Sequence, residues 1–562
     1  MVRNPTDERV TMRTSREFLR WNGWGRVDVQ FNTHGEEDAV WRFVAEALGT
    51  TSLPRTPAKT LEETSLPASR ASESFLSSLR EATDPARVHT STYERAFHAY
   101  GRSYFDLLRL RSGVLESAPD VVVYPTSKEE VLALLQCAEL HRFAVIPFGG
   151  GSSVVGGVEA LRGDKEGVLT LDTTLLTRVL HVDGVSRTAK IEAGIYGPEL
   201  EAQMAARGFI LGHQPQSFEY STLGGWVAAR GSGQLSNRYG SADKLVVGST
   251  LVTPRGILET GGFPASAAGP NLNQLVAGAE GTLGVITDVT MRLHAAPAAR
   301  SIFAFLFKRF DEGAAAIRTA VQEEVGAAMM RLSDIDETHF FGSFRGVLEP
   351  SRVHTLTEGA LGLAGYEDKC VLMVCIEGDA DEVKAKQSKM RRVAKAHGGF
   401  YVGQSPGKSW WKRRFEMPFL RDPMLDRGVG IDTLETSTEW SNLPRLYDAV
   451  RAAIRSYFEQ EGRKVIVMTH ISHSYLDGAS LYFTFLFLRD DTRAIAQWKG
   501  AKHAASRALV ENGGTISHHH GVGLDHAPYM AEEKGILGIA LLKGMRSTLD
   551  PAGVMNPTKL TG

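Results

Sequence analysis

The sequence contains very little cysteine. Only Cys137, Cys370 and Cys375 occur among its 562 residues, and no two of them form a Cys-x-x-Cys pair. This argues against a disulfide framework and against the common zinc-site spacings. We expect three buried, unpaired thiols that pack as small apolar side chains. Such cysteine usage is typical of a protein from a reducing compartment.

An excess of charge of either sign is also lacking. The chain has 63 Lys and Arg against 65 Asp and Glu, for a formal charge of −2. A protein that binds nucleic acid usually carries a basic patch or a basic pI. We therefore expect no nucleic-acid partner.

Long apolar runs and targeting signals are absent as well. No run of eighteen apolar residues occurs, so no membrane-spanning helix is predicted. The N-terminal residues lack the apolar core of a secretory signal, and the C-terminus is not a peroxisomal address tripeptide. The expected location is the cytoplasm, with any membrane contact peripheral.

The length and the pattern of elements predict an α+β protein with several domains. With 43% apolar and 23% charged residues, the composition is that of an ordinary globular chain. Short strands and turns alternate between residues 165 and 295, which is unlike a doubly wound fold. The expected units are a helical N-terminal region (1–115), a cofactor-binding domain (116–298), a cap or substrate domain (299–510) and a C-terminal segment (511–562).

Two stretches give the expected secondary structure in most detail. Residues 121–124 read as a strand, Ser127 as the N-cap of a helix that ends near Leu140, and residues 144–148 as a second strand that leads into a glycine turn. Strand-helix-strand order repeats twice between residues 302 and 402. We expect one helix-backed sheet there, and we predict that it is antiparallel.

The glycine turn at residues 148–154 reads Phe-Gly-Gly-Gly-Ser-Ser-Val. Glycines can adopt positive φ and direct several backbone N–H groups into one concavity, which suits a pyrophosphate. The turn does not match the Gly-x-Gly-x-x-Gly dinucleotide fingerprint, and a bare triple glycine is more often a flexible turn than a phosphate site. Two further glycine segments, at 221–226 and 277–284, strengthen the cofactor interpretation.

The order of these segments, GGGSS then STLGGW then EGTLGVIT, resembles the FAD-binding domain of the vanillyl-alcohol oxidase and p-cresol methylhydroxylase (PCMH) superfamily. The resemblance implies a two-part PCMH-type FAD-binding domain, a cap domain with an antiparallel sheet, and helical N- and C-terminal segments. It implies noncovalent FAD, because the 148–157 turn has no His or Cys to tether the flavin. The implied cofactor-binding residues are Phe148, Gly149, Gly150, Gly151, Ser152, Ser153, Val154, Gln216, Ser217, Phe218, Glu219, Tyr220, Ser221, Thr222, Ala229, Arg230, Gly231, Ser232, Glu280, Gly281, Thr282, Leu283, Gly284, Val285 and Ile286.

Further stretches resemble the alkyldihydroxyacetonephosphate synthase family over nearly the whole chain. The family exchanges the acyl group of acyl-dihydroxyacetonephosphate for a fatty alcohol and forms an ether lipid without net oxidation. The resemblance thus implies a lipid substrate, a possible peripheral membrane contact and a homodimer. The stretches that carry it are Trp21–Gly25, Gly101–Gly113, Gly212–Pro215, Leu434–Ser437, Tyr475–Phe483 and Ser517–Gly523.

The resemblance marks Tyr482 as a catalytic tyrosine. The strand 481–487 has apolar residues at 481, 483, 485 and 487, so Tyr482 and Thr484 are expected on the opposite face. On the residues alone, a core tyrosine is the more common role for such a residue, and the family match reverses that preference. A tyrosine base needs a depressed pKa, because a free phenol is mostly neutral at physiological pH.

The triplet His518, His519 and His520 matches the family's histidines and is expected to contact flavin and substrate phosphate. In an extended chain 518 and 520 would share one face, which argues against a three-ligand zinc site from the triplet alone, and we expect no metal. A generic triplet is also consistent with a polar loop. Arg331 is implied as catalytic, and Arg421 and Thr433 as substrate-binding.

Two positions depart from the family pattern. Gln216 stands where the family usually has Asp, and Thr433 stands where it has Ser. Both substitutions leave flavin binding intact in this interpretation but put the substrate in question.

A second hypothesis is an FAD-dependent dehydrogenase or oxidase of a 2-hydroxy acid such as D-lactate or glycolate, whose members share the pattern at 554–560. There His518 and His520, with His470 or His473, would bind a divalent metal or act as a base. A third hypothesis is an FAD carrier without turnover. Bleaching of the flavin by D-lactate or glycolate separates the second hypothesis from the first.

An apolar substrate needs access from a membrane surface. We expect it through the N-terminal region and the Ser/Thr/Pro-rich segment 51–75, where Trp21, Trp24 and residues 104–108 supply apolar side chains. Core packing is the alternative role of those side chains.

Overall fold

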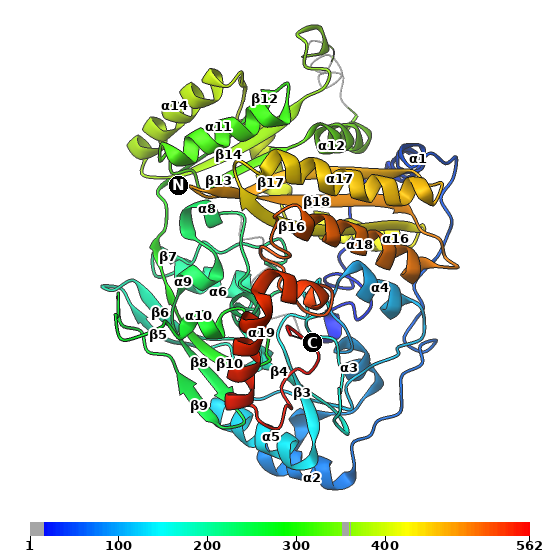
Figure 1. Ribbon diagram of the computed structural model, residues 1–562, viewed down its shortest axis with the longest axis vertical. Helices are drawn as coiled ribbons and strands as arrows, with labels where there is room; N and C mark the ends of the chain where they lie inside the picture. The colour runs from blue at the N-terminus through cyan, green and yellow to red at the C-terminus, as the bar shows by residue number, and fades with distance from the viewer. Residues whose placement is uncertain (1–15, 351–358, 360, 562) are drawn as a thin grey trace.

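The computed structural model describes residues 16–350, 359 and 361–561. Figure 1 shows two sheet-containing units stacked along the long axis, with the C-terminal segment running between them. We call them the glycine-rich unit, from β1 to β10, and the cap unit, from β12 to α18. Within the described residues no helix is long and apolar enough to cross a bilayer.

The first sheet of the glycine-rich unit has three parallel strands and one antiparallel edge strand. Helix α5 (Lys128–His141) connects two of the parallel strands, and the Ser127 side chain caps it by accepting a hydrogen bond from the Glu130 N–H. This confirms the predicted cap. In order across the sheet, the strands are β1 (Val88–His89), β2 (Val121–Val123), β4 (Gly167–Asp172) and β3 (Phe143–Phe148).

The second sheet of this unit is fully antiparallel. Helix α7 (Leu223–Ala228) packs on β10, and α6 (Gly197–Ala205) on the short strand β7 (Phe209–Ile210). The predicted α+β class is confirmed. The strands in order are β5 (Val179–Asp183), β6 (Thr188–Glu192), β10 (Val285–Arg292), β8 (Val246–Thr253) and β9 (Gly256–Glu259).

The cap unit has a seven-stranded sheet in which every neighbouring pair is antiparallel, as predicted. The strands in order are β15 (Phe400–Gly403), β12 (Ala299–Phe307), β14 (Cys370–Gly378), β13 (Met329–Ser333), β17 (Val465–Ser474), β18 (Gly478–Leu488) and β16 (Val429–Glu439).

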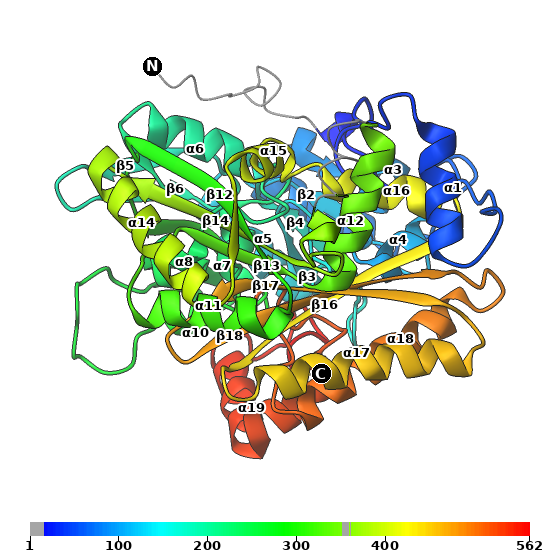
Figure 2. The same cartoon turned by 90° about the horizontal axis from the view of Figure 1, so that it is seen from above.

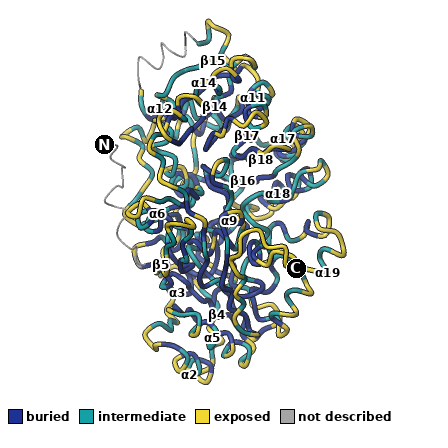
Figure 3. Tube along the Cα trace, turned by 90° about the vertical axis from the view of Figure 1, so that its left-hand side faces the viewer, coloured by how far each residue is buried: buried dark blue, intermediate teal, exposed yellow. Residues whose placement is uncertain are grey.

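The two faces of the cap sheet differ in polarity. Strand alternation places Leu481, Phe483, Phe485 and Phe487 on one face, all fully buried. Figure 2 shows α17 and α18 along this sheet, and Figure 3 shows buried segments running through both units. The helices that contribute to this apolar core are α11 (Phe310–Gln322), α14 (Ala380–Ala396), α17 (Leu443–Gln460) and α18 (Ala494–Glu511). The polar face is therefore the one left to form a site.

The terminal regions tie the units together. The C-terminal segment pairs beside β3, where the Val145 N–H donates to the Val554 carbonyl and the Asn556 N–H donates to the Val145 carbonyl.

The other described α-helices are α1 (Glu37–Ala47), α2 (Glu73–Ala82), α3 (Thr92–Phe97), α4 (Tyr104–Arg111), α8 (Ser236–Tyr239), α9 (Ala242–Leu245), α10 (Asn273–Val276), α12 (Ile335–Leu348), α15 (Ser405–Arg413), α16 (Arg421–Leu425) and α19 (Met530–Leu549).

Most of the N-terminal side chains that motivated the expected access route are buried, which fits their alternative role in core packing. Trp21 and Trp24 are buried, at 9% and 8% exposure, and Tyr104 and Leu107 are fully buried. They lie in the interior because the segment that contains Trp21 and Trp24, and helix α4, pack against the cap unit. Residues 51–72 have no helix and are mostly exposed, as expected of a surface excursion.

Candidate active site

A cavity of about 1910 Å³ lies between the glycine-rich unit and the polar face of the cap sheet. Its lining comes from the turn after β3, from the start of α7, from the segment before β10, and from the cap strands β13, β17 and β18. Segments far apart in the sequence thus share one chamber.

The wall on the side of the glycine-rich unit is built from main chain. A Cβ on Gly149 would overlap the Thr222 hydroxyl, and one on Gly150 would overlap the Tyr220 carbonyl oxygen. Gly151 has a φ of 69°, in the left-handed region that favours glycine. Thr222 Oγ1 is buried and has no hydrogen-bond partner among the described residues. A close-packed glycine turn beside an unpaired hydroxyl fits the pyrophosphate of FAD.

Most of the predicted cofactor residues line this cavity. They are Phe148, Gly149, Gly150, Gly151, Ser152, Ser153, Val154, Gln216, Ser217, Ser221, Thr222, Ala229, Gly231, Ser232, Glu280, Gly281, Gly284, Val285 and Ile286.

Six predicted cofactor residues do not line the cavity: Phe218, Glu219, Tyr220, Arg230, Thr282 and Leu283. Phe218 and Leu283 belong to apolar core clusters, and the Arg230 guanidinium donates to Asp243 and Gln274 instead. The motif places their backbones near the cavity, but packing turns these side chains elsewhere.

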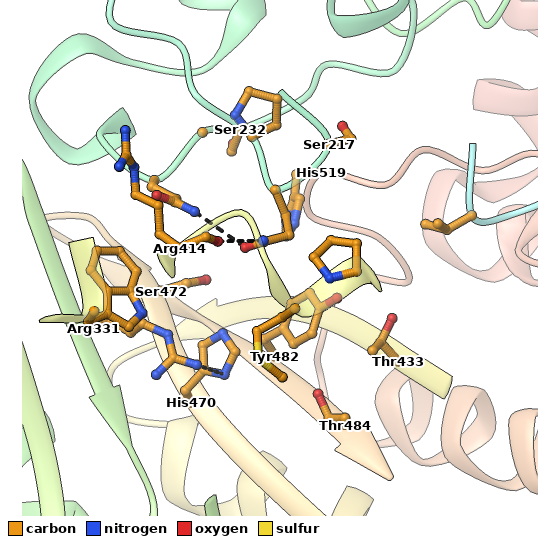
Figure 4. A pocket seen from close by; sticks show the side chains of 18 of the residues that line it. Ser217, Ser232, Arg331, Arg414, Thr433, His470, Ser472, Tyr482, Thr484 and His519 are labelled. Carbon is orange, nitrogen blue, oxygen red and sulfur yellow. Dashed lines mark hydrogen bonds between the residues drawn. The ribbon is translucent and has the colours of Figure 1, made fainter. Parts of the chain in front are cut away.

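The cap wall is built from ionisable side chains. The rings of Tyr482 and His470 stack with centroids 4.9 Å apart, and Figure 4 shows Tyr482 between His470 and His519. Glu337 Oε1 accepts from Arg331 Nη2 at 2.8 Å and lies 3.0 Å from His470 Nδ1. This ion pair fixes the imidazole on which Tyr482 stacks.

The electrostatics of Tyr482 differ from what a tyrosine base requires. Burial raises the pKa of its phenol, and the nearby Thr433 side chain and Arg421 charge offset only part of that rise. Tyr482 is therefore a protonated phenol at neutral pH. Burial lowers the pKa of His470, and it lowers that of His519 well below its ordinary value, although Glu337 and Glu435 respectively oppose the effect. The imidazoles are the neutral groups able to accept a proton.

One end of the histidine loop (residues 517–523) is held by the buried carboxylate of Glu435, on β16 directly opposite Tyr482. It accepts hydrogen bonds from the backbone N–H groups of His518, His519 and His520 at 2.6, 3.1 and 2.9 Å. Burial alone would raise the pKa of Glu435, but the three histidines and these N–H donors hold it well below its ordinary range.

These hydrogen bonds set the conformation of the triplet. Because consecutive N–H groups turn toward one carboxylate, the loop is not extended, and 518 and 520 do not pair on one face. Instead His518 Nδ1 lies 2.9 Å from His519 Nδ1. His519 and His520 line the cavity, whereas His518 does not.

The other end of the loop is held by Glu280, from the EGTLG segment. Its carboxylate accepts from the N–H groups of Val522 and Gly523 at 2.6 and 2.7 Å. Burial outweighs these donors and raises the pKa of Glu280 to about 7. The loop therefore connects the cofactor wall to the cap wall through two carboxyl groups whose pKa values are shifted in opposite directions.

Comparison with known proteins decides the family. The chain is 34% identical over 543 residues to the alkyldihydroxyacetonephosphate synthase of Dictyostelium discoideum, which covers 95% of this chain and 87% of that protein. This chain belongs to the alkyldihydroxyacetonephosphate synthase family.

A solved structure of an alkyldihydroxyacetonephosphate synthase agrees, with a TM-score of 0.84, 30% identity, and coverage of 97% of this chain and 99% of that one. The sequence models of the FAD binding domain and of the C-terminal domain of FAD linked oxidases match residues 119–262 and 296–560. The expected FAD cofactor, PCMH-type domain and cap are confirmed. Similarity to hydroxy-acid enzymes is weaker: the D-lactate dehydrogenase of Arabidopsis thaliana is 28% identical over 79% of this chain and 73% of that protein.

The residues that the synthase family implies as catalytic (Arg331, Tyr482) and as substrate-binding (Arg421, Thr433) reach the cavity. Arg331, Arg421, Thr433 and Tyr482 all line it. Arg421 Nη1 donates to the Arg102 carbonyl at 2.5 Å, which anchors the guanidinium at the cavity edge. Gln216, which departs from the family pattern, is hydrogen-bonded to the main chain. Its Nε2 donates to the Arg414 carbonyl at 2.6 Å.

Sequence reasoning missed three carboxylates that organise the site: Glu280 as a loop anchor, Glu337 and Glu435. It also left His470 as an alternative only. A usable signal was present for Glu435, because a charged residue between Leu434 and Thr436 inside a strand needs a buried partner. The partners themselves, which are backbone N–H groups some eighty residues later, carry no sequence signal.

Proposed function

We propose that this chain exchanges the acyl group of acyl-dihydroxyacetonephosphate for a long-chain fatty alcohol and produces alkyl-dihydroxyacetonephosphate. The bond between the substrate carbon and the acyl oxygen breaks, a bond to the alcohol oxygen forms, and a fatty acid leaves with the alcohol's proton, so no net electrons move. Family membership supports this reaction, and the observation that carries it is a cavity that joins the glycine cradle to Tyr482, the histidine loop and two arginines.

FAD, when bound, supplies a nucleophilic ring nitrogen in this reaction. The residues of the chain handle protons and orientation. The neutral imidazoles of His519 and His520 accept the proton removed beside the ketone. The protonated Tyr482, whose ring centroid lies 6.1 and 5.6 Å from theirs, donates to the departing acid.

Positive charge at the cavity suits the substrate phosphate. The Arg421 guanidinium donates from Nη1 to the Arg102 carbonyl, so its Nε and Nη2 can form a two-point contact with phosphate oxygens. Arg331, which donates to Ser333 and Glu337, adds positive charge beside it. Apolar side chains of Ile335, Phe341 and Ile431 also line the cavity and suit a hydrocarbon chain. We assign the phosphate to the arginines and the chains to this apolar lining.

The test is incubation of FAD-loaded protein with acyl-dihydroxyacetonephosphate and labelled hexadecanol, followed by lipid extraction. Labelled ether product is expected, and D-lactate and glycolate should leave the flavin absorbance unchanged. Absence of ether product together with bleaching by a hydroxy acid would contradict the exchange reaction and support the dehydrogenase hypothesis.

Peripheral membrane contact completes the proposal, because both substrates are lipids. Exposed Ile536, Leu537 and Leu541 on α19 offer an apolar surface for such contact, in place of the buried tryptophans. The homodimer rests on the family resemblance alone. Co-sedimentation with phospholipid vesicles and light scattering of the free protein test the two statements separately.

A further inference from the structure

His473 brings a third imidazole to the histidine loop. It lies near the end of β17 with 4% exposure, and its ring centroid is 5.1 Å from that of His518 and 5.5 Å from that of His519. One ring nitrogen from each of these three residues lies within 4.8 Å of the other two. A small inward adjustment brings such nitrogens to the spacing of ligands around one ion.

The hydrogen bonding of the cluster is incomplete. His473 Nδ1 is buried and has no hydrogen-bond partner among the described residues, which is costly for a polar atom unless something binds it. His518 Nε2 contacts the Tyr475 hydroxyl at 2.5 Å, so its Nδ1 is the nitrogen that faces His519 Nδ1 at 2.9 Å. Two ring nitrogens thus face each other beside a third nitrogen with no partner.

We propose that His473, His518 and His519 form a binding site for one divalent transition-metal ion of the zinc and cobalt class. Three imidazoles and no thiolate suit zinc, cobalt or nickel, whereas magnesium and calcium prefer oxygen ligands. Tyr475 supplies the partner on the second nitrogen of His518 that orients a metal-bound imidazole. The buried Glu435 carboxylate, 3.5 Å from His519 Nδ1, offsets the charge of the ion.

Occupancy of this site has a consequence for the reaction, which rests on the proposed function. His519 lines the cavity and is assigned to proton transfer. A bound ion takes up the lone pair of its ring nitrogen and holds the ring toward His473. Zinc therefore inhibits the exchange, and a chelator restores it.

The experiment is titration of tag-free, FAD-loaded protein with ZnCl₂ by calorimetry and with CoCl₂ by its visible ligand-field absorption. One ion per chain is expected. His473→Ala should weaken binding roughly 100-fold, and Tyr475→Phe about 10-fold, as loss of an orienting partner does. His181→Ala, which removes an exposed imidazole from β5, should leave binding as in the parent protein.

Two results would overturn the site: no stoichiometric zinc or cobalt binding, or binding that His473→Ala and Tyr475→Phe leave unchanged. Retained flavin absorbance and circular dichroism show that each variant is folded, and the largely exposed Tyr475 provides a second test if His473→Ala does not fold. The titrations need no turnover, so they stand even if the ether product is not found. Zinc that binds without slowing the exchange would contradict the inhibitory consequence.

Discussion

The two walls of the cavity use different chemistry. The wall from the glycine-rich unit presents backbone and glycines, with Gly149 and Gly150 packed so closely on Thr222 and Tyr220 that a Cβ would overlap them. The cap wall presents titratable side chains from neighbouring antiparallel strands, among them His470 and Tyr482. The first wall therefore depends on the absence of side chains, and the cap wall depends on the functional groups that its side chains carry.

The histidine loop belongs to both walls, and its two anchors repeat the contrast. Glu435 on the cap side is fully ionised, whereas Glu280 on the cofactor side has its pKa raised to about 7. Added bulk should therefore damage cofactor binding on one wall, and loss of a functional group should damage chemistry on the other.

The largest effect is expected from added bulk in the glycine wall. Gly150→Ala places a methyl group on the Tyr220 carbonyl oxygen, which displaces the turn and abolishes FAD retention. Flavin absorbance after gel filtration measures this. Gly184→Ala is the matched control, because Gly184 lies outside the cavity lining and its Cβ would come no closer than 3.7 Å to Phe209. Equal flavin content in the two variants would contradict the cradle.

On the cap wall, Tyr482→Phe removes one hydroxyl and no other group. The exchange rate should fall roughly 100- to 10,000-fold, the range for loss of a general acid or base. Flavin content and spectrum should be those of the parent protein, because Tyr482 lies on the other wall. Near-normal exchange would remove Tyr482 from the mechanism.

Glu435→Gln tests the cap-side anchor. A neutral amide cannot accept from all three N–H groups of the triplet, so the loop loosens and unfolding free energy falls by about 3 kcal/mol. Displacement of His519 should slow the exchange roughly 100-fold. Hydrogen exchange of the amides 518–520 should become faster, a readout independent of turnover. Glu439→Gln, at the exposed end of the same strand, should change neither property.

The smallest effect concerns Glu280 and pH. The folded protein holds the Glu280 proton up to about pH 7, whereas the unfolded chain releases it near the ordinary pKa of 4.5. Unfolding free energy therefore decreases as pH rises between these values. Glu280→Gln should flatten this part of the stability profile in denaturant titrations. Glu46, on the exposed face of α1, provides the control. If Glu46→Gln flattens the profile equally, the pH dependence does not come from Glu280.

Local patterns were enough to predict most of the elements. The Ser127 cap and the strand before the glycine turn follow from short-range periodicity and capping chemistry. Alternation along 481–487 was enough to place Tyr482 on the face opposite the phenylalanines. These predictions held because each depends on residues only a few positions apart.

Predictions that needed long-range contacts were less complete. The conformation of the histidine triplet was left open, and Glu435 decides it by gathering its N–H groups to one point. Trp21 and Trp24 were named for an N-terminal access route with core packing as the alternative, and their burial fits the alternative. The pKa of Tyr482 was expected to be depressed, but burial raises it.

The sequence by itself determined the fold class, the glycine cradle and the residue types of the site, because backbone conformation and strand alternation are local properties. Only the tertiary structure decided which carboxylate holds which end of the histidine loop, which imidazoles meet, and which groups are charged. These properties depend on desolvation and on distances between segments such as 280, 435 and 518–523. No single segment of the sequence records them, since the free energy of a buried charge is set by its neighbours in space.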